Sequence, residues 1–299
     1  MGTPEFAVPS LQKLVTAGWN IVAVITAPDK PKGRGQKMIP SPVKEAALQF
    51  NIPVLQPTNL KSPEFLDELA SYQADLQIVV AFRMLPEVVW GMPPLGTFNL
   101  HASLLPDYRG AAPINWAIIN GEKETGVTTF FLKHEIDTGS IIFQEKEPIH
   151  EEDNVGSLYE RLMAKGGDLV VKTVEAIASG NVSPQAQDEN KAKNHAPKIF
   201  KETCEIDWKK SAVEINNLIR GLSPYPAAWT NFQGKHCKIF NALPSDKNIA
   251  GLHPGEFKTD GKSELFFQTG KGHISILELQ LEGKKRLTID EFLRGFKIE

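Results

Sequence analysis

The sequence predicts an α/β fold, in which a doubly wound parallel sheet is followed by a second domain built as a compact β-barrel. Short apolar runs alternate with helical patterns over residues 1–182, which is typical of a parallel sheet covered by helices. The polar, weakly periodic stretch 183–203 is typical of a linker. Closely spaced short strands with Gly-containing turns follow in residues 204–299 and indicate a barrel.

Helices and strands alternate regularly in the first predicted domain. Leu11, Leu14 and Val15 share one face of a helix that ends at Gly18. Two further helices open on Ser-Pro, a favourable N-cap followed by a first-turn proline. Continuous β-branched or apolar runs between the helices predict buried strands. We expect helices at 9–18, 42–50, 62–72 and 158–177, and strands at 20–26, 76–81, 96–100, 127–132 and 140–145.

The second predicted domain starts after Cys204 with one helix, at 212–220, and a Pro-rich turn at 223–226. The rest of this domain consists of short strands, which we expect at 228–232, 238–242, 255–258, 265–269 and 273–281.

The chain opens on a turn, Gly2-Thr3-Pro4. In a doubly wound fold, we expect such a turn to follow a buried first strand. Such a strand is about five or six residues long. Its loss from the middle of the sheet would leave two neighbouring strands unpaired. We therefore expect the first strand to be missing, either because the natural start lies upstream of Met1 or because upstream residues were not built.

Composition places the chain among soluble globular proteins and excludes several other classes. It has 299 residues, 41% hydrophobic and 23% charged, which excludes collagen-like, low-complexity and mostly disordered chains. Its apolar runs are far shorter than a membrane span, and no signal-peptide pattern opens the sequence. The two cysteines form no CxxC pair. We expect a reduced, cytoplasmic protein that does not bind membranes.

Several cofactor classes lack their sequence signals. No G-x-G-x-x-G or Walker sequence follows any predicted strand, so dinucleotide and nucleoside triphosphate sites lose their main support. The seven histidines and two cysteines show no metal-ligand spacing, and we expect no metal. The net charge of −3 does not require a nucleic-acid partner.

Polar residues capable of catalysis lie near the end of the strand predicted at 96–100. Asn99 and His101 are two apart, so their side chains face the same side. An amide and an imidazole there could stabilise one carbonyl oxygen as it becomes an oxyanion, and the imidazole could move a proton. Asp137 follows a neighbouring strand and could pair with His101. An isolated Asn-x-His pair, however, more often caps a turn and packs at a strand end.

The surrounding string carries more information than the pair alone. Residues 99–114, with 124–128 and 137–139, resemble the motifs of the 10-formyltetrahydrofolate-dependent formyltransferases. Further similarities to the branch that acts on initiator methionyl-tRNA run the length of the chain, at 2–7, 28–35, 41–44, 206–208 and 223–229.

The resemblance implies a Rossmann-like catalytic domain and a C-terminal OB-like tRNA-binding barrel. Asn99, His101 and Asp137 align with the catalytic triad of the family. Its members transfer the formyl group of 10-formyltetrahydrofolate to the methionine of initiator tRNA, for translation initiation. We expect a monomer whose partners are this tRNA and folate. The implied folate-contacting segment is Ser103, Leu104, Leu105 and Pro106, where a Leu-Leu-Pro turn could supply an apolar wall and exposed backbone groups.

Two basic segments are expected to contact tRNA. The first is the loop that carries Lys30, Lys32, Arg34 and Lys37, in which Arg34 aligns with the central arginine of the family's loop. The second is the cluster Lys284, Lys285 and Arg286 in the C-terminal domain. Both could instead be solvated surface, since cation-rich loops usually are.

Some alternatives remain open on the sequence alone. A UDP-amino-sugar formyltransferase of the same superfamily is the nearest rival, and a tRNA-binding module without catalysis is another. A glycinamide ribonucleotide formyltransferase lacks a second domain of this kind.

Arg83 departs from the family pattern and could reach folate, the tRNA end or an acidic partner. His134 is a second titratable group near Asp137, and we assign it no catalytic role.

Overall fold

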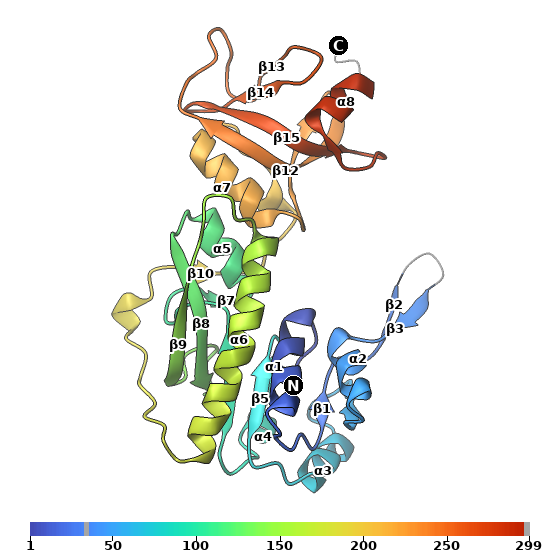
Figure 1. Ribbon diagram of the computed structural model, residues 1–299, viewed down its shortest axis with the longest axis vertical. Helices are drawn as coiled ribbons and strands as arrows, with labels where there is room; N and C mark the ends of the chain where they lie inside the picture. Colours follow the sequence, from blue (N-terminus) through green and yellow to red (C-terminus); the bar gives the residue numbers. More distant parts are fainter. Residues whose placement is uncertain (33–35, 296–299) are drawn as a thin grey trace. The chain divides into compact units, whose positions relative to one another are not determined.

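The computed structural model describes residues 1–32 and 36–295 and divides into two compact units (Figure 1). The first comprises Met1–Gly110, Thr125–Glu147 and Tyr159–His195, and the second comprises Ala111–Glu124, Pro148–Leu158 and Ala196–Glu299. Each unit therefore draws on segments that are distant in sequence. The predicted division at residues 182 and 204 stays a prediction.

The first unit contains the helices and strands that the sequence pattern predicts, with shifted ends. The two Ser-Pro starts are confirmed as N-caps, because Ser41 Oγ accepts from Lys44 N–H and Ser62 Oγ from Phe65 N–H. The elements lying wholly or largely in this unit are η1 (Glu5–Ala7), α1 (Val8–Thr16), β1 (Val24–Ile25), β2 (Lys30–Lys32), β3 (Lys37–Ile39), α2 (Pro42–Gln49), β4 (Val54–Leu55), α3 (Pro63–Ser71), β5 (Gln77–Val80), α4 (Glu87–Trp90), β6 (Thr97–His101), β7 (Arg109–Gly110), β8 (Glu124–Phe131), β9 (Ile141–Pro148), α6 (Val155–Ala178) and η2 (Glu189–Lys191).

The sheet that carries the candidate site is mixed rather than wholly parallel. Its strand order is β5-β6-β8-β9. β5 and β6 pair in parallel, as do β1 and β4, but β8 runs antiparallel to β6. Parallel pairing is therefore confirmed for β5 with β6 and for β1, whose partner β4 was not predicted, and the prediction is wrong for β8. A continuous apolar run indicates that a strand is buried, but it carries no information on direction.

The first two residues lie between β1 and β5. Gly2 N–H donates to Ile25 O at 3.0 Å, and Val80 N–H donates to Met1 O at 2.9 Å. Beside them is a cavity of about 670 Å³, lined by the segments around β1 and β5 together with α1 residues. The expectation that a further strand belongs at this position stays a prediction.

Helix α6 covers one face of this sheet, alongside α1. A Cβ at Gly166 would lie 2.7 Å from Leu100 Cδ2 on β6, so the glycine allows close packing of helix on strand. Thr173 of the helix meets Thr129 of β8 through their hydroxyls at 2.9 Å. Lys13 of α1 forms an ion pair with Asp168 at 2.6 Å. β6 thus lies between β5 and β8 in the sheet and packs against α6 on one face.

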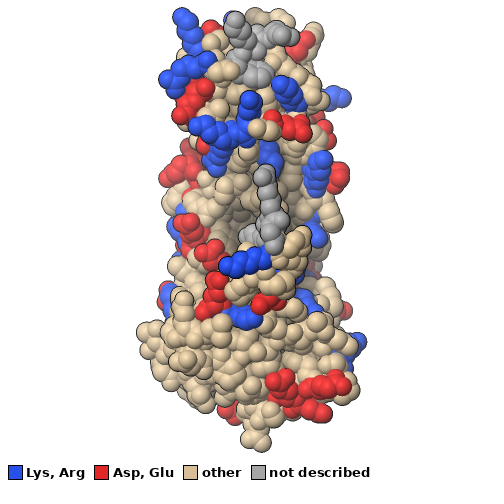
Figure 2. All heavy atoms as spheres, turned by 90° about the vertical axis from the view of Figure 1, so that its right-hand side faces the viewer, with Lys and Arg blue, Asp and Glu red and all other residues tan. Residues whose placement is uncertain are grey.

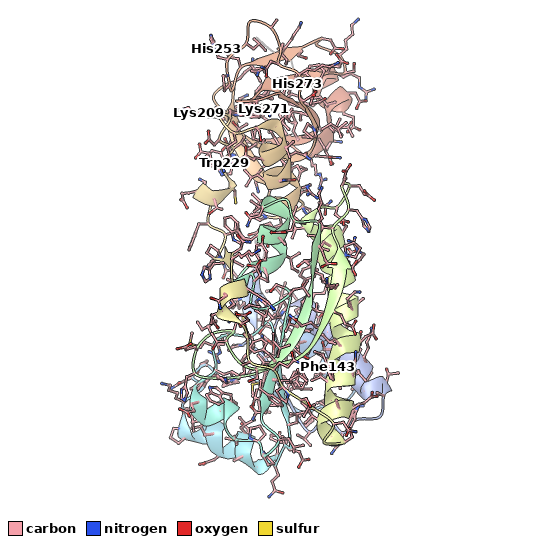
Figure 3. The ribbon with its side chains drawn as sticks, turned by 90° about the vertical axis from the view of Figure 1, so that its left-hand side faces the viewer. Phe143, Lys209, Trp229, His253, Lys271 and His273 are labelled. Carbon is pink, nitrogen blue, oxygen red and sulfur yellow. The ribbon has the colours of Figure 1, made fainter. Side chains whose placement is uncertain are left out.

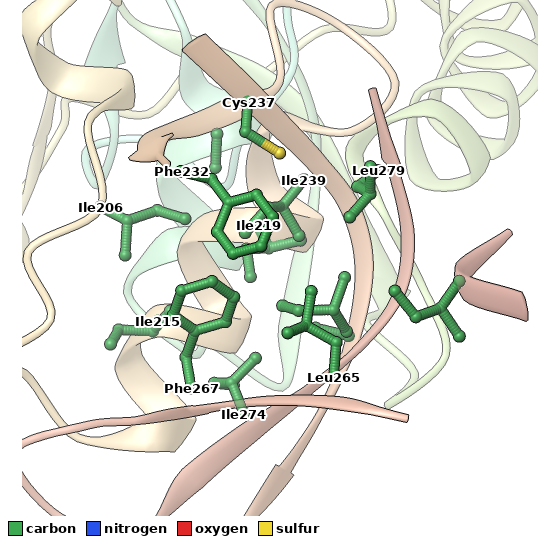
Figure 4. Packing of buried hydrophobic residues seen from close by; sticks show 14 of the residues in the cluster. Ile206, Ile215, Ile219, Phe232, Cys237, Ile239, Leu265, Phe267, Ile274 and Leu279 are labelled. Carbon is green, nitrogen blue, oxygen red and sulfur yellow. The ribbon is translucent and has the colours of Figure 1, made fainter. Parts of the chain in front are cut away.

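The second unit is built on an antiparallel sheet of order β11-β12-β15-β14-β13, with β16 beside β15. Helix α7 packs against it over a core that includes Ile215, Ile219, Phe232 and Phe267 (Figure 4). No pairing closes the sheet between β11 and β13 among the described residues, so a closed barrel is not confirmed. Its elements are α5 (Pro113–Ile119), η3 (Glu202–Cys204), α7 (Ala212–Leu222), β11 (Ala228–Phe232), β12 (Lys235–Ser245), β13 (Phe257–Thr259), β14 (Leu265–Gln268), β15 (His273–Leu281), β16 (Leu287–Thr288) and α8 (Ile289–Gly295).

The stretch expected to be a linker is bound along the first unit for much of its length. Gln185 forms two backbone hydrogen bonds with Ile141 of β9, each 2.8 Å long. Short elements η2 and β10 (His195–Ala196) also lie in this stretch. Neither its polarity nor its weak periodicity indicated these contacts.

Candidate functional site

Two polar side chains lie near the end of β6. Asn99 is in register with Val79 of β5 and with Phe130 of β8, so its backbone is paired on both sides. His101 is in register with Thr128 of β8 alone. His101 is 7% exposed. Asn99 is half-buried, and its amide forms no hydrogen bond with the described part of the chain. The amide is therefore free to donate to a bound molecule.

The imidazole of His101 lies between a backbone carbonyl and a carboxylate. Nε2 is 2.9 Å from Tyr108 O, and a carbonyl only accepts, so Nε2 carries the hydrogen in this contact. Nδ1 is 3.9 Å from Asp137 Oδ2, a distance for an ion pair that is too long for a direct hydrogen bond. The predicted pairing with Asp137 is therefore an ion pair only when the imidazole is protonated. Nδ1 is the ring nitrogen left to meet a substrate atom.

Asp137 sits in the turn between β8 and β9 with a φ of 57°. This left-handed conformation is unusual for a residue with a side chain and persists only when the surroundings hold it. The carboxylate Oδ2 accepts a hydrogen bond from Gly110 N–H at 3.1 Å. With 14% of its side chain exposed, the carboxylate is largely withdrawn from water and directed at His101.

The three groups form an arrangement suited to acyl or formyl transfer. A partly exposed amide donor and an imidazole on one strand face can meet an oxyanion, and a nearby carboxylate can attract positive charge that develops on the imidazole. Donors fixed on a rigid strand need no reorganisation as charge develops. The structure thus places His101 beside Asp137, and Asn99 lies two residues before His101 on the same strand. The catalytic roles of the three residues stay a prediction.

The predicted folate-contacting segment is more buried than expected. Ser103, Leu105 and Pro106 are buried, and Leu104 is partly exposed. The expectation of exposed backbone groups is wrong for several of them: Thr128 Oγ1 donates to Ser103 O and accepts from Leu105 N–H, and Gln144 Nε2 donates to Leu105 O. These internal bonds fix the loop beside His101. Of the four residues, Leu104 is the one left with substantial surface for a ligand.

Lys30, Lys32 and Lys37 lie on a β-hairpin made by β2 and β3, where Lys32 and Lys37 are opposite in register. Lys30 and Lys37 are exposed, and Arg34 lies outside the described residues. At the base of the hairpin, Lys44 Nζ donates a hydrogen bond to Asp29 at 2.7 Å. This bond lowers the pKa of the Asp29 carboxyl. The hairpin thus presents cations from a fixed base.

Lys284, Lys285 and Arg286 lie in the connection between β15 and β16, and all three are exposed. The Arg286 guanidinium pairs with Glu278 and lies 4.2 Å from the centre of the Phe240 ring. Its charge is therefore partly neutralised, whereas no ion pair to Lys284 or Lys285 is found in the described chain. Figure 2 shows Lys and Arg side chains gathered over the second unit on one face, with acidic side chains among them.

Two residues left open by the sequence have clear contacts. Arg83 donates to the carbonyl oxygens of Thr58 and Pro57, so it fixes a neighbouring loop instead of pairing with an acid. His134 is exposed, with Nε2 3.3 Å from Glu87 Oε1 and its ring edge-on to Trp90. Neither side chain is directed at His101.

Some residues near the candidate site, and two lysines of the second unit, were not singled out from the sequence. Gln187 contacts the Asp137 turn, and Arg109 contacts Gln187. The composition of the predicted linker gave no signal for Gln187. Lys209 and Lys271 lie on neighbouring segments of the second unit, where Gly270 packs on the Lys209 carbonyl (Figure 3). Because Lys209 and Lys271 are 62 positions apart, the sequence alone did not show that their segments lie side by side.

No cluster of three or more His, Cys, Asp or Glu side chains suited to a metal occurs in residues 1–32 and 36–295. Within the same ranges, no helix combines the length and the apolar character required to cross a bilayer.

Comparison with protein families gives two matches that together cover most of the chain. Residues 1–174 match the model described as formyl transferase, and residues 198–297 match that of the formyl transferase C-terminal domain. A methionyl-tRNA formyltransferase of Bacteroides fragilis is 56% identical over 306 residues, covering 100% of this chain and 94% of the relative. The methionyl-tRNA formyltransferase of Flavobacterium johnsoniae is 53% identical, covering 99% and 94%.

Solved structures resemble the fold at low sequence identity. WlaRD, a sugar 3N-formyl transferase crystallised in the presence of dTDP and 5-N-formyl-THF, has a TM-score of 0.69 at 23% identity, covering 95% of this chain and 97% of that one. An N-formyltransferase from Helicobacter canadensis in complex with folinic acid and dTDP-3-aminofucose has a TM-score of 0.67 at 22% identity, covering 96% and 97%.

Proposed function

The chain belongs to the formyl transferase family, and from this premise we propose that it transfers the formyl group of 10-formyltetrahydrofolate to the methionine of initiator methionyl-tRNA. The observation that carries the proposal is the identity of 53–56% to methionyl-tRNA formyltransferases over essentially the whole chain. The conjunction of Asn99, His101 and Asp137 supplies the chemistry that such a transfer requires.

The reaction makes one C–N bond and breaks another. The neutral amino group of methionine attacks the formyl carbon, and the formyl oxygen becomes an oxyanion. We assign its stabilisation to the Asn99 amide and to Nδ1 of the protonated His101, with Asp137 stabilising the imidazolium from 3.9 Å. Collapse of the tetrahedral intermediate breaks the bond to N10 of the folate. As that bond breaks, the protonated His101 donates its Nδ1 proton to N10, and the neutral imidazole then accepts the proton that the newly formylated amino group loses.

The folate donor would lie beside Leu104, whose side chain offers an apolar surface next to the catalytic groups. Gly126 allows this placement, because a Cβ there would lie 2.5 Å from Leu104 Cδ2. Ser103, Leu105 and Pro106 would support that surface from within. In this proposal the segment acts mainly through shape, since much of its backbone is already hydrogen-bonded.

The tRNA would be bound by cations on both units. In the catalytic domain, proposed at 1–182, these are Lys30, Lys32, Arg34 and Lys37; after the 183–203 linker, the C-terminal domain at 204–299 supplies Lys284, Lys285 and, more weakly, Arg286. The proposed C-terminal fold is OB-like, a common nucleic-acid platform. A monomer acting in the cytoplasm fits this function.

Replacing Lys37 with alanine is expected to weaken binding of initiator tRNA and leave folate binding unchanged. Loss of one phosphate contact lowers the slope of log affinity against log salt by about one unit. Arg34→Ala should have the larger effect. The measurement is tRNA and folate affinity at several salt concentrations, with Lys61→Ala, an exposed lysine elsewhere on the first unit, as control. Equal loss of folate and tRNA binding would contradict the assignment.

The function itself is tested with purified protein, 10-formyltetrahydrofolate labelled in the formyl group, and aminoacylated initiator tRNA. The expected product is formylmethionine, released from the tRNA by mild base and identified by mass. Methionyl-tRNA recovered without label, under conditions where a methionyl-tRNA formyltransferase used as reference is active, would refute the proposal.

A further inference from the structure

Gln187 links the Asp137 turn to a distant part of the chain. It lies in the stretch after α6, fifty positions from Asp137 in sequence. Its Nε2 donates to Asp137 O at 2.7 Å and to Gly139 O at 2.8 Å. One side-chain amide therefore holds two carbonyls of the turn that carries the catalytic carboxylate.

The partners of Gln187 fix the orientation of its amide. Its Oε1 accepts from Arg109 Nε at 3.1 Å and from Arg109 Nη2 at 2.6 Å. A guanidinium can only donate and a backbone carbonyl can only accept, so the oxygen must face Arg109 and the nitrogen must face the turn. Rotation of the amide would lose all four contacts.

Arg109 is itself held in place. Its Nη1 and Nη2 each donate to one oxygen of Glu189, both at 2.8 Å, in a two-point contact. This contact raises the pKa of Arg109 and lowers that of Glu189. The next residue, Gly110, donates its N–H to the Asp137 carboxylate at 3.1 Å. The short segment 109–110 thus holds Asp137 directly by its carboxylate and, through Gln187, by its backbone.

This arrangement explains how Asp137 keeps a φ of 57°. A left-handed aspartate is less stable than an extended or helical one unless bonds to its neighbours compensate. We infer that Gln187, held by Arg109 and Glu189, is a positioning residue that keeps the Asp137 carboxylate facing Nδ1 of His101. The inference rests on the proposed function, because it assigns Gln187 a part in that site.

The test begins with Gln187→Ala and Gln187→Glu. The glutamate keeps an acceptor for Arg109 but loses both donors to the turn. For each variant we expect kcat to fall by about 10- to 100-fold, since a misplacement of about 1 Å can reduce a rate 10²-fold. KM for methionyl-tRNA and for folate should stay within about twofold, because Gln187 touches neither in the proposal. The matched control is Gln185→Ala, whose side chain is exposed and whose backbone bonds to Ile141 are kept.

A double-mutant cycle with Asp137→Asn separates positioning from general support. If Gln187 acts through the carboxylate, adding Gln187→Ala to Asp137→Asn should lower kcat by less than about twofold further. An additive loss would overturn the inference, as would wild-type kcat in Gln187→Glu. Thermal unfolding identifies any variant that fails to fold, and Gln187→Glu carries the test if Gln187→Ala is lost. If the wild-type chain formylates no methionyl-tRNA, the proposed function fails instead.

Discussion

Replacing His101 with alanine is expected to lower single-turnover formyl transfer by at least about 10²–10³-fold. The substitution removes the imidazole that meets the developing oxyanion and carries the proton between the two nitrogens. The backbone of His101 pairs with Thr128 of β8, so the strand end should persist in the variant although the buried imidazole leaves a cavity. The loss should therefore appear in the chemical step, measured by rapid quench with enzyme in excess over labelled methionyl-tRNA.

The matched control for His101 is His134→Ala. His134 lies in the first unit near the Asp137 turn, but it is exposed and its ring faces Glu87 and Trp90. Its removal should change the rate by less than about twofold, because the side chain does not face His101 and a surface substitution changes stability by only about 0.5 kcal/mol. A near wild-type rate for His101→Ala, or equal losses for the two histidines, would remove His101 from the mechanism.

Asn99→Ala should cost a similar factor, about 10²–10³-fold in the same single-turnover assay. Its amide forms no hydrogen bond with the described residues, so alanine disrupts no internal contact and the folded structure should be retained. Asn99→Asp tests the same point through charge. It keeps the size of the side chain but replaces the donor with a carboxylate that repels an oxyanion, and it should be at least as slow.

The control for Asn99 is Asn181→Ala, at an exposed amide that bonds to Ser179 away from the strand end. Circular dichroism and folate binding should be unchanged in all three variants. If Asn99→Asp retained the wild-type rate, the side chain would not donate to the oxyanion.

Local patterns predicted the elements that carry the site. The strand predicted at 96–100 is β6, Thr97–His101, and the period of two correctly places Asn99 and His101 on one side. The helix starts at Ser41 and Ser62 were also predictable, because capping is decided by the adjacent residues. The pairing of Asp137 with His101 was predicted from the position of Asp137 after the strand expected at 127–132, and the resemblance then aligned Asn99, His101 and Asp137 with a catalytic triad.

Features that depend on tertiary contacts were not predictable. β8 runs antiparallel to β6 because of the way the connecting chain returns to the sheet. The apolar sequence of β8 does not indicate this direction. Helix α5, with three isoleucines and a tryptophan, was not anticipated. It belongs to the second unit, where Asn115 Nδ2 donates to Gly221 O at 2.8 Å. Gln187 lies in a stretch whose composition is typical of a free linker. Its role depends on three partners that are far away in sequence.

The choice of acceptor tests the central claim most directly. Labelled 10-formyltetrahydrofolate is offered to the protein with initiator methionyl-tRNA in one reaction and UDP-4-amino-arabinose in another, each with the His101→Ala protein as blank. We predict rapid formylation of the methionyl-tRNA, abolished by the substitution, and no transfer to the sugar nucleotide. Transfer to the sugar nucleotide with none to methionyl-tRNA would contradict the account.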